Sequence, residues 1–446
     1  MNRLLPLALL VAAPLLADGS HVLAIKIDPA ARQLYVEGTA TLPAADRTIT
    51  FALSPHMTDV KVRLPRAKVV SLHSEEKQGD RYWTVRTDRS LPPQVTVSFS
   101  YRSDTEAAPQ FAICPEGSFA GGGGELWYPQ ADFKVRDTGS MVFTVPRDVT
   151  VTATGTLVTK RIRATDAQFV FRVTYPSKFA FAAGPYIVQQ SGGTPSLSLY
   201  LLRDRMGAKE FLPKVAGALG YLQTMFGPLP YDELRLVEVD FPGRVLGTSE
   251  YEQLFVDDAK LATFDLSYWA HEIGHQWWGN LVRSRSGVPG GMLLSEGVAQ
   301  LGALWSVEAV EGAASAERFR RSGYEGGNGQ SAKSYFQLVE AGVDMPLATT
   351  VPSSQSDILT MHRLANTKGF LVLDMLARII GRDQFIGVLR SFIAAKRDTL
   401  TSWPELRQSI QEATAEDMEW FFTQWTEREG APYFHLTWIG DVYESD

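Results

Sequence analysis

The residues with the clearest capacity for chemistry are His271, Glu272 and His275, which lie in the stretch AHEIGHQWWGN. On a helix, residues four positions apart share one face, so the two imidazoles can converge on a single metal ion. Zinc held by two histidines and a third protein ligand keeps one position open, where it lowers the pKa of a bound water to about 7. Glu272 would be the general base that takes the proton from that water. The alternative is a pair of core histidines on a buried helix, but the chain has only seven histidines, so a chance match is rare.

A third ligand is expected downstream, and the segment GMLLSEGVAQ at 291–300 offers Glu296. An apolar run precedes Glu296 and small residues follow it. This pattern predicts a second helix, packed against the first, with one carboxylate directed at the metal.

The two segments together resemble a known family. HEIGHQWWGN followed by LLSEGVA is similar to the paired motifs HExxHQWFGN and WLNEGFA of the M1 gluzincin aminopeptidases. The resemblance implies one zinc ion per chain, bound by His271, His275 and Glu296, and peptide substrates with a free N-terminus. His275 and Glu296 are somewhat farther apart than is usual in the family, and the usual spacing would fall on Leu294, which cannot bind zinc. We place the extra residues in the loop 284–291 and keep Glu296.

Two further glutamate positions correspond to amine-binding groups in the family. Gly247-Thr248-Ser249-Glu250-Tyr251 resembles the GxMEN strand, which implies that Glu250 binds the substrate α-amine by a charge-assisted hydrogen bond. Gly247 would let an extended peptide approach the backbone closely. The alternative for Glu250 is a solvated surface glutamate.

A second amine-binding group comes, in the family, from the β domain. The local possibilities are Glu116 and Glu125, which flank the glycine run 121–124, and we favour Glu125 because it is near Trp127 and Tyr128. No GK[ST] follows the glycines, so they do not form a phosphate-binding loop.

One departure from the family concerns catalysis. The segment Asn366-Thr367-Lys368-Gly369 stands where the family has YxKG, whose tyrosine donates to the oxyanion. An asparagine amide can donate too, and one such donor is worth about 10²–10³ in rate, but its side chain is shorter. Either Asn366 still reaches the oxyanion, or His362 or Tyr335 replaces it, or turnover is severely reduced.

The order of elements predicts an α+β multidomain chain. Residues 21–190 read as short alternating or β-branched runs separated by turn signals, which is typical of an antiparallel β domain. Helix-compatible segments dominate after the Gly/Thr/Pro segment at 192–195. We expect a leader at 1–17, a β-sandwich or saddle domain at 18–193, and a thermolysin-like, mainly helical zinc metallopeptidase domain at 194–446. The strands are expected at 22–27, 48–53, 60–64, 94–101, 141–145 and 169–174, and the helices at 209–225, 265–280, 295–310, 369–380, 383–394, 403–413 and 420–427.

Composition agrees with an exported globular protein. Residues 1–17 have one positive charge, an apolar run and a small residue, as in a secretory signal, although a retained anchor is the alternative. The net charge of −7 comes without a Lys/Arg block, which argues against nucleic acid as a partner, and no later segment is apolar for long enough to span a membrane. Cys114 is the single cysteine, and we expect it to be a small buried side chain.

The likeness to the M1 family extends further along the chain. FGPLPY at 226–231 resembles the segment before the catalytic sheet, and FAFAAG at 179–184 resembles the last strand of the β domain. The chain stops where longer members begin a further helical domain, which implies a short form with a more open substrate channel. The leading hypothesis is a periplasmic or secreted zinc aminopeptidase. The alternatives are a catalytically impaired, zinc-retaining peptide-binding protein and a zincin endopeptidase.

Overall fold

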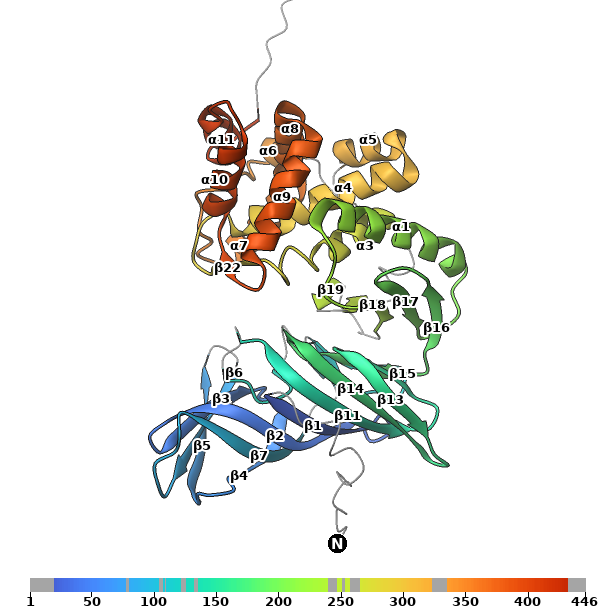
Figure 1. The fold of residues 1–446 in the computed structure, drawn as a ribbon, viewed down its shortest axis with the longest axis vertical. Helices are drawn as coiled ribbons and strands as arrows, with labels where there is room; N and C mark the ends of the chain where they lie inside the picture. The colour runs from blue at the N-terminus through green and yellow to red at the C-terminus, as the bar shows by residue number, and fades with distance from the viewer. Residues whose placement is uncertain are drawn as a thin grey trace, which may run out of the picture. The chain divides into compact units, whose positions relative to one another are not determined.

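The structure is a computed structural model, shown in Figure 1. It describes residues 20–77, 80–103, 107–108, 110–121, 126–131, 135–239, 247–250, 253–256, 265–322 and 335–431. The chain forms two compact units, Met1–Gln223 with Pro228–Gln276, and Thr224–Gly227 with Trp277–Asp446. Strands dominate the first part of the chain and helices the second, which confirms the predicted fold class. The expected leader at 1–17 lies outside the described residues.

The first unit is built around a ten-stranded sheet. Its main path runs through the strands β13 (Thr156–Ile162), β14 (Asp166–Ser177), β11 (Asp137–Pro146), β1 (His21–Asp28), β2 (Gln33–Ala45), β3 (Thr48–Leu53), β6 (Asp80–Thr87) and β5 (Val69–Lys77), with β4 (Met57–Arg63) and β7 (Gln94–Ser103) paired beside β2. Neighbouring strands pair in antiparallel fashion, except that β1 and β11 run parallel. The predicted antiparallel character thus holds for this sheet except at β1 and β11, which are distant in sequence and have no hairpin turn to fix their direction.

Alternating side chains explain why this sheet forms. Along β2 the apolar residues Leu34, Val36, Ala40 and Leu42 are buried, as expected for a strand with one face against the core. A smaller five-stranded sheet follows the order β12 (Thr150–Ala153), β15 (Phe181–Gly184), β10 (Ser118–Ala120), β9 (Phe111–Ala112) and β8 (Ala107–Ala108). Trp127 is fully buried in the same core, where its ring nitrogen donates to the carbonyl of Phe179 at 2.8 Å.

A second five-stranded sheet, also in the first unit, leads toward the site. Its order is β16 (Ile187–Ser191), β17 (Ser196–Leu201), β18 (Glu233–Glu238), β20 (Gln253–Val256) and β19 (Gly247–Glu250). Strands β17, β18 and β20 are parallel, whereas β19 is antiparallel to β20. Residues 192–195, where we expected a change of domain, form the turn between the paired strands β16 and β17. The domain boundaries themselves stay predictions.

Apart from the short parallel strands β21 (Arg283–Ser284) and β22 (Leu400–Thr401), the remaining described elements are mainly helices. They are α1 (Ala208–Phe226), α3 (Leu266–Gly274), α4 (Val298–Glu311), α5 (Ala313–Ser322), α6 (Tyr335–Glu340), α7 (Gln355–Leu364), α8 (Phe370–Ile380), α9 (Arg382–Lys396), α10 (Trp403–Ala413) and α11 (Glu419–Thr426). Figure 1 shows α8 and α9 next to each other, in agreement with their packing contacts. Within the described part of the chain, no helix is both long enough and apolar enough to cross a membrane.

Two segments of five residues are π-helical. The segment η3 (Leu293–Gly297) leads directly into α4, and the segment η4 (Ala365–Gly369) joins α7 to α8. A π-turn is a rare local widening of a helix that occurs often at functional sites. Both segments carry residues that the sequence had singled out, Glu296 and Asn366.

Candidate metal centre

The two histidines of the HExxH motif belong to α3 and its C-terminal cap. Asp265 caps the N-terminus by accepting a hydrogen bond from the amide of Ser267 at 2.9 Å. His275 caps the other end, and its amide donates to the carbonyl of His271 at 3.3 Å. The helix thus ends at Gly274, before the predicted end at 280, but His271 and His275 still lie one helical turn apart.

Aromatic residues fix the chain where α3 ends. The hydroxyl of Tyr231 donates to the side-chain oxygen of Gln276. The ring nitrogen of Trp277 donates to the carbonyl of Gly227 at 3.0 Å, and its ring lies 5.6 Å from that of Phe226. Since Phe226, Gly227 and Tyr231 belong to the segment FGPLPY, this motif and HQWW support each other.

Glu296 lies on the π-turn η3. The chain enters this segment through Gly290, which has a φ of +80° and whose added Cβ would lie 2.4 Å from the Cβ of Trp403. Glycine is therefore required at this turn. Leu294, where the usual family spacing would fall, is buried in the apolar core, whereas Glu296 has a partly exposed carboxylate. The additional residues placed in the loop 284–291 are therefore consistent with Glu296, and not Leu294, being next to the two histidines.

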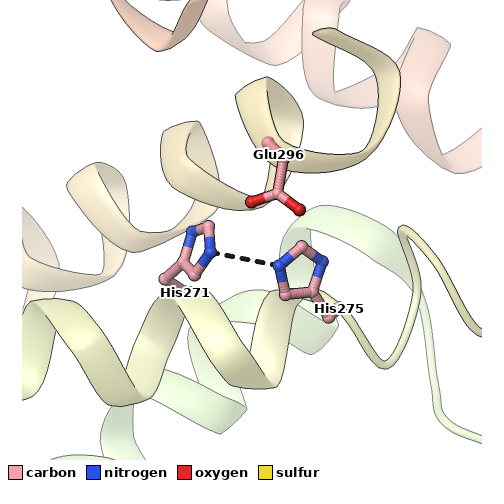
Figure 2. Close-up of side chains that lie close together, drawn as sticks. All are labelled: His271, His275 and Glu296. Atoms are coloured by element: carbon pink, nitrogen blue, oxygen red, sulfur yellow. Dashed lines mark hydrogen bonds between the residues drawn. The ribbon is translucent and has the colours of Figure 1, made fainter. Parts of the chain in front are cut away.

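The three expected metal ligands lie together. One ligand atom from each of His271, His275 and Glu296 falls within 4.8 Å of the other two. Figure 2 shows the two imidazoles with one nitrogen of each directed toward the other, and the carboxylate of Glu296 directed toward them from a different helical segment. The Nε2 atoms of the two histidines are 3.0 Å apart.

This donor set fits zinc. Two nitrogens bound to one tetrahedral zinc at the usual bond length of about 2.0–2.1 Å are separated by roughly 3.3 Å, which is close to the observed spacing. Two imidazole nitrogens and one carboxylate oxygen are also ligand types that zinc accepts, and a set of three leaves one position for a water or substrate. Within the described residues, a set of three ligands matches the arrangement typical of catalytic zinc sites, whereas structural zinc sites have four protein ligands.

The family comparison agrees with this geometry. Residues 252–425 match the family model described as the Peptidase family M1 domain. The chain contains a peptidase family M1 domain. The match includes all three ligands and Glu272, and it implies a zinc metallopeptidase.

Solved structures resemble the whole chain beyond the M1 domain. The M1 zinc metallopeptidase from Deinococcus radiodurans is 18% identical, with a TM-score of 0.68, and the match covers 93% of this chain and 94% of that chain. A mutant of that protein bound to a Tyr-Ser-Ala substrate matches with the same values. A structure described as a two-domain M1 zinc metallopeptidase mutant bound to L-tryptophan matches with a TM-score of 0.67, at the same identity and coverage. At this identity the likeness establishes the fold. No curated protein matches the sequence.

The expected general base and the expected substrate-binding residues lie on several different elements. Glu272 follows His271 on α3 and is buried. Gly247 and Glu250 are the first and last residues of β19, and β19 packs against α3. Glu116 is exposed in the turn before β10. Glu125, which we favoured as a second amine-binding group, lies outside the described residues.

Asn366 stands at the position where the M1 family has the tyrosine of its YxKG pattern. Asn366 is buried on η4, and its Nδ2 lies 3.1 Å from Oε2 of Glu296. His362 lies one turn upstream on α7, and its half-exposed ring places Nε2 3.4 Å from the same Glu296 oxygen. Both residues therefore adjoin a metal ligand, as no sequence signal had indicated, since 70 positions separate Asn366 from Glu296.

Tyr335, the other suggested replacement, is engaged elsewhere. Its hydroxyl lies 2.9 Å from Oδ2 of Asp344 and 2.8 Å from the carbonyl of Gly430. Burial, with the adjacent Asp344 carboxylate, raises the pKa of Tyr335 above its usual value. Lys368 donates to the same Asp344 oxygen at 3.3 Å and to the carbonyl of Arg428 at 2.8 Å. Tyr335 and Lys368 thus anchor the segment around 428–430 and are structural residues of the M1 domain.

Proposed function

We propose that the protein is an exported zinc-dependent aminopeptidase of M1 type, which releases N-terminal residues from peptides. The observation that carries this proposal is the convergence of His271, His275 and Glu296. The buried Glu272 directly follows His271 on α3. Zinc bound there would supply the Lewis acid that polarises the scissile carbonyl and activates the attacking water. Periplasmic or secreted location is inferred from the leader-like residues 1–17.

Glu272 would move the proton. A carboxylate placed one residue from His271 on the same helix can accept a proton from the attacking water and return it to the leaving amine. Its burial restricts the number of side-chain positions and keeps bulk water from competing for the proton. Glu272 therefore acts on the reacting groups without being a metal ligand.

Strand β19 would hold the peptide. Within the described residues β19 pairs with β20 alone, so it forms the end of its sheet. An edge strand offers backbone donors and acceptors to an extended peptide, and Gly247 places no side chain in the way. Glu250, on the same strand, would bind the protonated α-amine and so restrict cleavage to the first peptide bond.

Relatives of similar fold support a peptide substrate. The Deinococcus radiodurans mutant was captured with a Tyr-Ser-Ala substrate, and the two-domain mutants with L-tryptophan and L-arginine. A tripeptide and single amino acids are the substrate and product classes that an aminopeptidase handles. For this chain we infer the same classes.

The proposal is tested with one peptide in two forms, with a free N-terminus and with an acetylated one. The purified protein, analysed for zinc in the same sample, should hydrolyse the free form and leave the acetylated form intact. Equal hydrolysis of both forms would show an endopeptidase. Tight binding of the free form without hydrolysis, by protein that contains zinc, would show a peptide-binding protein instead.

A further inference from the structure

Asn366 contacts a proposed metal ligand where a substrate-facing group was expected. Its Nδ2 lies 3.1 Å from Oε2 of Glu296 and also 3.1 Å from the carbonyl oxygen of His362. Asn366 is 4% exposed, so these contacts are shielded from bulk water. Hydrogen bonds to an ionised group in such surroundings are stronger than those between neutral groups.

The chemistry of these partners fixes the orientation of the amide. An ionised carboxylate and a carbonyl can only accept hydrogen bonds, so the group that faces both must be the NH₂ of Asn366. That group has two hydrogens, and the oxygens of Glu296 and His362 account for both. In this arrangement the NH₂ of Asn366 faces protein acceptors, which favours a role beside Glu296 over the expected role as a donor to a substrate oxyanion.

We propose that Asn366 is a positioning residue, which holds the carboxylate of Glu296 toward His271 and His275 and so raises the affinity of the site for zinc. This inference rests on the proposed role of Glu296 as the third ligand. A glutamate side chain has three rotatable bonds, and a hydrogen bond to one carboxylate oxygen removes most of that freedom before the metal binds. Hydrogen bonds behind a ligand typically change metal affinity by 10–100-fold.

The backbone of η4 explains how a short side chain reaches Glu296. The carbonyl of His362 lies four residues upstream, in the last turn of α7, and it accepts one amide hydrogen while the second points across to Glu296 on η3. His362 and Asn366 share a helix face because they are four residues apart, so the ring of His362 also meets the Glu296 carboxylate. Both η4 and its upstream helix thus contribute to the surroundings of one ligand.

The test measures zinc affinity of the metal-free protein by competition with a chromogenic chelator. Asn366→Leu keeps the branching and the number of side-chain heavy atoms but has no donor, and Asn366→Ala has no donor and cannot clash. Both should bind zinc 10–100-fold more weakly than the unmodified protein. Thr367→Val is the matched control, because Thr367 is a buried neighbour on η4 whose hydroxyl donates to the carbonyl of Arg363 at 2.8 Å. This control should keep the original zinc affinity.

A spectroscopic measurement separates positioning from general damage. In protein loaded with Co²⁺, the visible absorption bands report ligand geometry, and they should shift in Asn366→Leu and stay unchanged in Thr367→Val. Unchanged zinc affinity and unchanged bands in both Asn366 variants would overturn the proposal. Equal losses in the Asn366 variants and in Thr367→Val would overturn it as well, since the cause would then be a distorted η4.

Glu296→Gln, measured in the same assay, distinguishes this inference from the proposed function. If Glu296→Gln weakens zinc binding but the Asn366 variants do not, the ligand set stands and the role of Asn366 is wrong. If Glu296→Gln leaves zinc binding unchanged, the third-ligand assignment itself fails. In the expected result, the double variant loses less affinity than the sum of the two single losses, because Asn366 acts through Glu296.

Discussion

Gly297 and Gly369 lie next to each other, since a Cβ added to Gly369 would be 3.5 Å from the Cα of Gly297. The two glycines end the π-turns η3 and η4. Without side chains, they let the two segments approach closely enough for the amide of Asn366 to reach Glu296. Both glycines also adjoin the side chain of Leu293, whose Cδ1 would lie 3.0 Å from a Cβ at Gly297 and 3.2 Å from one at Gly369.

Replacing Gly297 by valine should force η3 and η4 apart. A Cβ there would already lie 3.0 Å from Cδ1 of Leu293, and the two methyl groups would extend the crowding. We expect a loss of about 1–3 kcal/mol in the free energy of unfolding, together with weaker zinc binding. Denaturant unfolding checks the first and chelator competition the second. Gly220→Ala on α1 is the control: its Cβ would meet no atom within 4 Å, and the change should stabilise the protein by about 0.5–1 kcal/mol.

The metal content should depend on the three ligands and not on the base. His271→Ala and His275→Ala should remove the zinc, whereas Glu272→Gln should retain it and lose peptidase activity. Elemental analysis of each purified variant, combined with a hydrolysis assay, separates the two classes. Loss of zinc from Glu272→Gln would mean that Glu272 contributes to the metal site and is not simply the base.

Exopeptidase character should depend on Glu250. Glu250→Ala should raise KM for peptides with a free N-terminus and lower kcat/KM, because the lost charge-assisted bond no longer places the first peptide bond at the metal. Zinc content should not change. Steady-state kinetics with a series of aminoacyl substrates would measure both kinetic changes. An unaltered kcat/KM would mean that Glu250 is a surface residue of β19 with no role in substrate binding.

Acid should destabilise the β-rich unit through His21. This histidine is buried, with Nε2 2.8 Å from the carbonyl of Pro129 and Nδ1 3.0 Å from Oγ of Ser20. Burial lowers the pKa of His21, although the nearby Asp137 carboxylate and the Pro129 carbonyl oppose this. The unfolded chain takes up a proton below about pH 6.5, whereas the folded chain does so only at lower pH.

The sign of the effect follows from that order of protonation. Above about pH 6.5 His21 is neutral in both states and contributes no pH dependence. As the pH falls from there toward the lowered pKa, the free energy of unfolding should decrease. Urea unfolding between about pH 5 and 8 measures this slope, and His21→Gln should flatten it. An identical slope in the variant would assign the acid sensitivity to other groups.

Much of the architecture could be predicted because it depends on local patterns. The apolar periodicity at 209–225 and 403–413 matches α1 and α10, and the alternation at 48–53 matches β3. Pairing between distant segments had no such signal, which is why the parallel contact of β1 with β11 was missed. The proximity of His271 and His275 could be predicted because a single helical turn fixes their spacing.

The surroundings of Glu296 could not be predicted in the same way. A π-turn has no characteristic composition, so neither LLSEG nor ANTKG indicated one, and the expected helices began only at 295 and 369. The contact between Asn366 and Glu296 depends on how η3 and η4 pack. The sequence of either segment alone does not predict this contact. Comparison with a family pattern directed attention to Asn366, but toward substrate and not toward a ligand.

The π-turns η3 and η4 also make the direction of a site residue independent of the direction of the buried residues that follow it in the helix. In an α-helix each residue advances by about 100°, so the direction of one side chain dictates the direction of all the others. The extra residue in η3 lets Glu296 be aimed independently of the apolar stripe that α4 buries farther along, and η4 does the same for Asn366 and α8. Deleting one residue from either segment would therefore rotate a site residue against an unchanged core, which makes chain length at these two points a direct means of retuning the metal centre.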